Sequence, residues 1–120
     1  MAEVLKLPTF TDTRGSLTVI EKLLPFQVQR IYYLYNITNE RGGHRHKVTK
    51  QALICLGGSC EIYVHDGEEE IFFLLDSNDK CLIIEPEDWH TMKNFSEGAI
   101  LLVLASEYYD AEDYIDQKYI

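Results

Sequence analysis

Two histidines one residue apart, His44 and His46, follow a pair of glycines and are the strongest candidates for chemistry in the sequence. Residues i and i+2 of a β-strand point to the same face, so a strand here would bring both imidazoles together and turn Arg45 to the opposite face. A pKa near neutral suits an imidazole both to proton transfer and to metal binding. The spacing therefore predicts an acid–base site or a metal site at these two histidines.

A third histidine, His90, follows Trp89 and lies four residues before Asn94. Near the first two, it could complete a three-histidine metal site or form part of a pocket wall. The remaining histidine, His65, lies beside an Asp-Gly turn, where we expect an exposed side chain. One site built from His44, His46 and His90 is therefore the hypothesis to test.

The net charge of the chain limits its partners. The 120 residues include 11 Lys or Arg and 20 Asp or Glu, which gives a formal net charge of -9. An acidic protein is a poor candidate for non-specific binding to nucleic acid, which depends on neutralising phosphates. The first half nevertheless holds basic residues that could bind one small anion or balance acidic neighbours at the surface: Arg14, Arg30, Arg41, Arg45, Lys47 and Lys50.

Short runs rich in Val, Ile, Leu, Phe and Tyr must position these residues. We expect strands at Leu17–Glu21, Val28–Tyr35, Gln51–Leu56, Cys60–His65, Glu70–Leu75, Lys80–Ile84 and Ile100–Leu104. Gly57-Gly58 and Asp66-Gly67 are typical of hairpin turns. Many short strands in a chain of this length indicate a single all-β domain over residues 1–120, built as a sandwich or a barrel.

The two ends of the chain carry separate predictions. Within residues 1–10, the isolated run Val4–Pro8 predicts an edge strand or a strand exchanged with a second subunit. Residues 107–120 are expected to form a helical tail, with a helix over Asp110–Tyr119 that Asp110 caps.

The sequence also predicts a compartment. No secretory leader and no run of about 20 apolar residues is visible, so we expect no membrane segment. The cysteines Cys55, Cys60 and Cys81 include no C-x-x-C pair and are expected to be reduced core residues. These features favour a cytoplasmic protein.

The chain resembles the cupin superfamily, whose jelly-roll barrel carries a His-x-His motif followed by Pro and His-x-x-x-Asn. The matching residues are His44, His46, Pro86, His90 and Asn94. The first cupin motif typically continues to a metal-binding Glu, but this sequence has Gln51 there, close to Lys47 and Lys50. A neutral amide and two lysines disfavour a divalent cation. The resemblance therefore implies a cupin barrel, with a short C-terminal helix, more strongly than it implies a metal.

Further motifs resemble one cupin family, the sugar 3,4-ketoisomerases of the FdtA/QdtA, WxcM-like type. They cover nearly the whole chain in the family's order: Asp12–Leu17, Arg30–Tyr33, Arg41–Lys47, Gln51–Cys60, Trp89-His90, Leu104–Asp110 and Asp113–Ile115. Members of this family form homodimers with exchanged N-terminal strands, so the resemblance implies the same for this chain. They move the ketone of dTDP-4-keto-6-deoxyglucose from C4 to C3 without metal or cofactor. The resemblance implies a cytoplasmic isomerase that serves deoxy- and amino-sugar synthesis for bacterial surface glycans, such as lipopolysaccharide or S-layer glycan.

The resemblance also implies the groups that move protons. We expect His44 to abstract the C3 proton and His46 to manage the protons on oxygen and at C4, or the reverse. A tyrosine is expected to order or protonate the sugar oxygen. Tyr32 shares a strand face with Arg30, which makes it a better candidate than Tyr33.

The remaining site residues are expected to bind the substrate. Arg14 and Arg41 lie beside glycines and match family positions, so we expect them to bind the pyrophosphate. Tyr33 and His90 are expected to contact the substrate, His90 from the pocket wall. Arg14 and His90 also resemble the branch of the family that forms the galacto product.

Three alternatives stay open. A sugar-nucleotide 3,5-epimerase is also a cupin, but that family resembles a His–Asp dyad with a Tyr acid, and the sequence shows no comparable dyad. A metal-dependent cupin enzyme is disfavoured by Gln51. A non-catalytic sugar-nucleotide-binding cupin would not need the pair His44 and His46.

Overall fold

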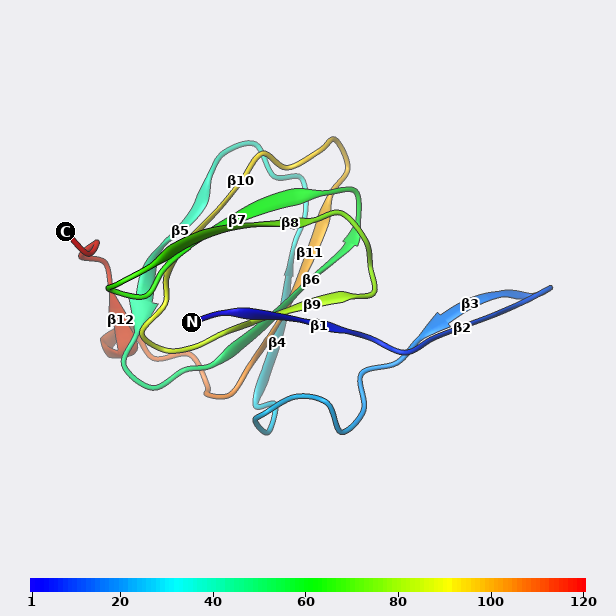
Figure 1. The fold of residues 1–120 in the computed structure, drawn as a ribbon, viewed down its shortest axis with the longest axis horizontal. Coiled ribbons are helices and arrows are strands. Elements are labelled where there is room, and N and C mark those ends of the chain that lie inside the picture. The colour runs from blue at the N-terminus through cyan, green and yellow to red at the C-terminus, as the bar shows by residue number, and fades with distance from the viewer.

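Two antiparallel five-stranded sheets face each other in the computed structural model, which describes all residues from 1 to 120 (Figure 1). The first sheet has the order β1 (Glu3–Lys6), β9 (Lys80–Ile84), β6 (Gln51–Gly57), β11 (Ile100–Ala105) and β4 (Arg30–Leu34). The second has the order β12 (Tyr114–Ile115), β5 (Arg41–His46), β10 (Trp89–Lys93), β7 (Cys60–His65) and β8 (Glu70–Leu75). The predicted all-β double sheet is confirmed.

The core fills the space between the two sheets. Strand residues alternate between faces, so every second side chain of a strand points inward. Leu53 and Val103 of the first sheet and Ile62 and Val64 of the second belong to one buried cluster. Full burial of each such side chain stabilises the fold by about 1.5–3 kcal/mol. Cys55 and Cys60 are free thiols in this cluster, and Cys81 is a free thiol in a second buried cluster; all three are buried, as predicted.

Most strand predictions are confirmed within a residue or two at each end, but four strands were not predicted as such. These are β2 (Thr9–Asp12), β5, β10 and β12. Strand β5 begins with Arg-Gly-Gly and β10 follows an acidic loop, so neither has the β-branched composition that marks a strand. Both gain their backbone hydrogen bonds from neighbours that are distant in sequence.

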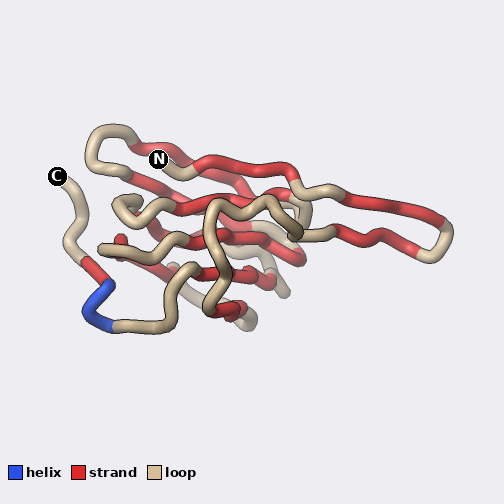
Figure 2. Tube along the Cα trace, turned by 90° about the horizontal axis from the view of Figure 1, so that it is seen from below, coloured by secondary structure: helices blue, strands red, loops and turns tan.

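The predicted helix over Asp110–Tyr119 is wrong. The structure has one 3₁₀ turn, η1 (Ala111–Asp113), followed by β12, which pairs with β5 (Figure 2). A ten-residue helix is marginal by itself, and here pairing with a strand edge and burial of Asp113 outweigh it. The capping role of Asp110 is confirmed, since its carboxylate accepts a hydrogen bond from the amide of Glu112.

The N-terminal segment divides into a paired strand and a projecting hairpin. Strand β1 pairs with β9 of the same chain. Strands β2 and β3 (Gly15–Thr18) pair only with each other and extend away from the barrel, on the side opposite β12 (Figure 1). Phe10 and Leu17 of this hairpin are 64% and 60% exposed. No helix is long and apolar enough to span a membrane.

Candidate active site

A β-bulge in strand β5 brings the predicted histidines together. In the register with β10, His44 lies opposite His90 and Gly42 opposite Thr91, so Gly43 is the extra residue. Gly42 and Gly43 have φ of 87° and 85°. A Cβ on Gly42 would lie 2.9 Å from the His90 carbonyl oxygen, so this close approach of β5 to β10 requires glycine.

The three imidazoles form one wall of the barrel interior, which we call the histidine wall: His44, His46 and His90. The ring centroid of His44 lies 5.1 Å from that of His46 and 5.2 Å from that of His90. No group of three or more His, Cys, Asp or Glu side chains is arranged to hold a metal ion. The predicted absence of a metal stays a prediction.

His46 is oriented by a carboxylate from the far end of the chain. Its Nδ1 lies 2.9 Å from Oδ2 of Asp113, which also accepts a hydrogen bond from the Thr49 hydroxyl. The other Asp113 oxygen accepts bonds from the amides of Lys47 and Val48 at 3.1 and 2.8 Å. This acceptor places the hydrogen of a neutral His46 on Nδ1, so that its buried Nε2, which has no protein partner, carries no hydrogen and can accept one.

The pKa values of this pair have opposing causes. Burial lowers the pKa of His46, while the hydrogen bond and charge of Asp113 counter part of that effect. Burial alone would raise the pKa of Asp113, but the bonds from Thr49, Val48 and His46 hold it below its ordinary value. The result is a charged carboxylate that stabilises a proton on His46.

The other two imidazoles are neutral near pH 7. Burial and the neighbouring His46 lower the pKa of His44 to about 4. Burial lowers the pKa of His90 to about 3, and its Nδ1 donates to the backbone oxygen of Asp88 at 3.0 Å. The histidine wall therefore presents unprotonated imidazoles, which can accept protons.

Hydrogen-bond donors lie opposite the histidine wall, on the first sheet. Arg30 and Tyr32 share the inner face of β4, and the guanidinium carbon lies 4.9 Å from the centroid of the Tyr32 ring. The Gln51 amide donates to the Tyr32 oxygen at 3.1 Å. Burial is the main cause of the raised pKa of Tyr32, so its phenol keeps its proton at neutral pH. Such donors can stabilise negative charge on a ligand oxygen.

Tyr114 of β12 closes the site from the side. Its ring centroid lies 4.7 Å from that of His44 and 4.6 Å from that of His46. Its hydroxyl accepts a hydrogen bond of 3.4 Å from Arg30. This residue links the histidine wall to the donors on the first sheet.

The structure brings together some of the predicted site residues and separates others. His44, His46, His90 and Tyr32 meet in the barrel interior. Arg41 is exposed at the start of β5, and its charge counters part of the rise in the Tyr32 pKa.

Two predicted substrate contacts do not reach the histidines. Tyr33 points to the outer face of the first sheet and is 60% exposed, because it alternates with Tyr32 along β4. The side chain of Arg14 is 88% exposed at the tip of the β2–β3 hairpin, where it forms an ion pair with Asp12. In a single copy, the hairpin lies on the far side of the barrel from β12 and the histidine wall (Figure 1).

Sequence reasoning missed two partners of the histidines. The expectation that no His–Asp dyad exists is wrong, because Asp113 binds His46 from 67 positions away. Tyr114 was also given no role. The run Asp113-Tyr114-Ile115 matches the family motif, and this match was the available signal for both residues.

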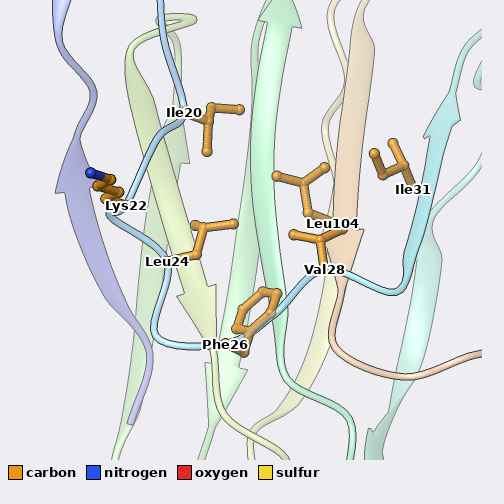
Figure 3. Close-up of a pocket in the computed structure, with 7 residues that line it drawn as sticks. All are labelled: Ile20, Lys22, Leu24, Phe26, Val28, Ile31 and Leu104. Atoms are coloured by element: carbon orange, nitrogen blue, oxygen red, sulfur yellow. The ribbon is translucent and has the colours of Figure 1, made fainter.

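An apolar hollow elsewhere lacks the groups for proton transfer. Figure 3 shows this hollow of about 380 Å³ on the outer face of the first sheet, lined by Ile20, Lys22, Leu24, Phe26, Val28, Ile31 and Leu104. It contains no histidine, tyrosine or carboxylate. The side chains suited to proton transfer therefore lie elsewhere, in the barrel interior.

Comparison with known proteins identifies the family of the chain. A family model described as "FdtA: WxcM-like, C-terminal" matches residues 1–119. The chain belongs to this family. A TDP-4-oxo-6-deoxy-alpha-D-glucose-3,4-oxoisomerase from Aneurinibacillus thermoaerophilus is 42% identical over 119 residues, which cover 96% of this chain and 86% of that protein. The resemblance to sugar 3,4-ketoisomerases is thereby confirmed, and the protein is an isomerase.

Solved structures confirm the cupin-type fold of this FdtA-family chain. A 3,4-ketoisomerase from Helicobacter canadensis is 41% identical, with a TM-score of 0.92 over 97% of this chain and 90% of that chain. A sugar 3,4-ketoisomerase from Thermoanaerobacterium thermosaccharolyticum in complex with TDP is 42% identical, with a TM-score of 0.91 over 97% and 88%. A dTDP-4-dehydrorhamnose 3,5-epimerase from Bacillus anthracis, at 18% identity and a TM-score of 0.83, shares the fold alone.

Proposed function

We propose that this protein moves the keto group of TDP-linked 4-keto-6-deoxyglucose from C4 to C3. The observation that carries the proposal is the interior site, where unprotonated imidazoles face the donors Arg30 and Tyr32. The names of the relatives at 41–42% identity, one of them bound to TDP, support the same substrate class. The proposed pathway is deoxy- and amino-sugar synthesis for surface glycans, in the cytoplasm.

The reaction relocates two protons, from C3 and O3 to C4 and O4, with no net oxidation. His44 removes the C3 proton, and the electron pair of that C–H bond forms the C3=C4 double bond while the C4 carbonyl becomes an enediolate oxygen. Tyr32 and Arg30 stabilise that oxygen. His46 then takes the O3 proton and delivers it to C4, where the electrons of the double bond form the new C–H bond. The O3 electron pair forms the C3 carbonyl, and the proton held by His44 passes to O4.

His46 is suited to the second part of this sequence. Asp113 stabilises the protonated imidazole, so His46 can hold a proton between its removal from oxygen and its delivery to C4. The reverse assignment of His44 and His46 uses the same groups. Positioned acid and base groups of this kind contribute about 10²–10⁴-fold to a rate.

Analysis of the product tests the proposal. The EDTA-treated protein is incubated with TDP-4-keto-6-deoxyglucose, and NMR follows the sugar. We expect a 3-keto sugar, whose C4 proton coupling distinguishes the galacto product, favoured by Arg14 and His90, from the gluco product. A 4-keto sugar that stays unchanged both in EDTA and after metal is restored would reject the proposal. A 3-keto product that forms only when metal is restored would favour the metal-dependent alternative.

The β2–β3 hairpin supports a homodimer as part of this proposal. Its eight strand residues include seven exposed ones, and a two-stranded hairpin is marginal in water by itself. Ile31 and Tyr33 on the outer face of β4, together with Tyr35 just after the strand, form an exposed apolar row. We infer that a second copy covers these surfaces and that the hairpin carries Arg14 to the phosphates bound in the partner's site.

Mixed variants test whether Arg14 acts across the dimer. Arg14→Ala and His44→Ala proteins are unfolded, mixed and refolded together, with each variant refolded alone as the control. If Arg14 acts on the partner's site, each heterodimer has one site with both groups intact, and activity at substrate concentrations below the wild-type KM rises above that of either variant. Activity no higher than the average of the separate variants, with heterodimers present, would contradict exchange.

A further inference from the structure

Gln51 is a buried polar residue inside the barrel, and the reaction as described gives it no task. It begins β6, where it pairs with Ala105 of β11 and Ile84 of β9. It has the same strand parity as Leu53 and Cys55, which belong to the interior cluster. Only 2% of its surface is exposed. A buried amide is destabilising unless its hydrogen-bonding groups have partners, so its presence calls for a reason.

One half of the Gln51 amide has a partner, and that partner is Tyr32. The amide nitrogen donates to the phenolic oxygen at 3.1 Å. A phenol has one hydrogen to donate, and this bond uses its oxygen as an acceptor. The hydrogen of the Tyr32 hydroxyl is therefore left to point elsewhere, toward an acceptor that the protein does not supply.

The other half of the Gln51 amide has no protein partner. Its Oε1 is buried and accepts no hydrogen bond from the chain. A carbonyl oxygen accepts from hydroxyl or N–H donors, and sugar hydroxyls are donors of this kind. The same residue thus offers a fixed neighbour to Tyr32 and a free acceptor to a ligand.

We propose that Gln51 is a positioning residue of the isomerase site, which directs the Tyr32 hydroxyl hydrogen toward the sugar oxygen and accepts a hydrogen bond from a sugar hydroxyl. This inference rests on the proposed function. The Arg30 guanidinium lies over the Tyr32 ring, 4.9 Å from its centroid, and also packs on this side chain. Arg30, Arg41 and Tyr114 are the charged and titratable groups that act on Tyr32.

Two substitutions separate this role from simple packing. Gln51→Leu keeps the volume and removes both hydrogen-bonding groups, so we expect kcat/KM to fall about 3- to 10-fold, as for the loss of a neutral hydrogen bond. Gln51→Glu places a carboxylate beside Tyr32, which takes the phenol hydrogen away from the sugar. We expect a larger loss at pH 7.5, about 10- to 100-fold, the range for a hydrogen bond to a charged group.

The pH profile of Gln51→Glu tests whether the residue at position 51 sets the direction in which the Tyr32 hydroxyl donates its hydrogen. Below the pKa of the new carboxyl group, which burial raises, its O–H can donate to the Tyr32 oxygen as the amide does. We expect its rate relative to wild type to recover as the pH falls from 7.5 to 5.5, whereas the relative rate of Gln51→Leu stays constant. All assays contain EDTA. The inference would be overturned if the rates of both variants relative to wild type stayed constant between pH 7.5 and 5.5. It would also be overturned if Gln51→Leu had the wild-type kcat/KM.

A second readout does not depend on activity. The bond from Gln51 lowers the pKa of Tyr32, so Gln51→Leu should raise it. NMR of protein labelled with ¹³C at the tyrosine ζ carbon measures this value, and a Tyr32→Phe sample assigns the signal. An unchanged Tyr32 pKa would overturn the inference. If the pKa rises but wild type forms no 3-keto sugar, the Gln51–Tyr32 contact holds and the proposed function fails.

Discussion

The histidine wall and the β2–β3 hairpin differ in where their polar side chains find partners. In the wall, His46 is held by Asp113, and His90 is held by the backbone of Asp88. In the hairpin, Arg14 pairs only with its near neighbour Asp12, and both are exposed. The side chains of the wall find their partners within one chain, whereas the two strands of the hairpin pair only with each other. We infer that the wall performs the chemistry and that the hairpin supplies affinity across the dimer.

The largest expected effect comes from removing an imidazole of the wall. We expect His44→Ala and His46→Ala each to lower kcat by about 10²–10⁴-fold, the usual contribution of a positioned acid or base. His65→Ala is the matched control, because His65 lies beside a surface turn where its ring bonds the Gly67 amide. Steady-state kinetics measure the effect, and near-normal turnover in either variant would place the chemistry outside the wall.

Asp113→Asn should have the next largest effect. The carboxylate accepts four hydrogen bonds, and an amide has only one oxygen to replace its two acceptors. Loss of the bond that orients His46 should lower kcat about 10- to 100-fold, as expected for a hydrogen bond to a charged group. Asp110→Asn is the control, because asparagine caps a helical turn as well as aspartate does. Equal kcat values for the two variants would contradict the role of the dyad.

The pH dependence of stability sharpens the same comparison. The pKa of His44 is about 4 and that of His90 about 3 in the folded protein, both below the ordinary value of 6.5. The unfolded chain therefore binds more protons, and the free energy of unfolding decreases as the pH falls from 6.5 toward 4. We expect a loss of about 5 kcal/mol between pH 7 and pH 4.5, about half of it from each imidazole, measured by urea unfolding, because one pKa unit corresponds to about 1.36 kcal/mol.

His90→Gln provides the control for that measurement. It removes the most buried titrating imidazole, so the free energy of unfolding should differ less between pH 7 and pH 4.5. If the same difference persisted in His90→Gln and in a matching His44→Gln protein, the histidine wall would not be its source.

The smallest effect is expected in the hairpin. Arg14→Ala should raise KM by roughly tenfold with little change in kcat, because a bound phosphate would lose one charge-assisted hydrogen bond. The midpoint of thermal unfolding should stay within a degree or two, since the Arg14 side chain is 88% exposed. Thr13→Ala is the neighbouring control. A fall in kcat with unchanged KM would contradict a role limited to binding.

The sequence was informative where periodicity or motif spacing is local. Alternation in Cys60–His65 and the spacing of His44 and His46 lie within one strand, and both predictions of a shared face agree with the structure. The same alternation favoured Tyr32 over Tyr33, and Tyr32 lies inside the barrel. The alternation of side chains along a strand thus predicts from sequence alone which residues share a face.

The predictions that failed depend on contacts between distant parts of the chain. Asp113 reaches His46 only because β12 adds to the edge of β5, and the same pairing replaces the predicted helix. The bulge at Gly43 likewise depends on the register with β10. No local pattern specifies which strand edge a tail will join. The contact between Gln51 and Tyr32 likewise depends on the order of the sheet, in which β11 lies between β6 and β4.

The central claim is that the histidine wall moves the C3 proton of a TDP-linked sugar, and isotope placement in D₂O tests it most directly. Wild type, His44→Ala and Arg14→Ala proteins are incubated with TDP-4-keto-6-deoxyglucose, and NMR locates deuterium in the sugar. We predict deuterium at C4 of the 3-keto product and none at C5. Arg14→Ala should place deuterium at the same position, but at a lower rate when the substrate concentration is low. His44→Ala should incorporate no deuterium. Deuterium at C5, or an unchanged exchange rate with His44→Ala, would contradict the account.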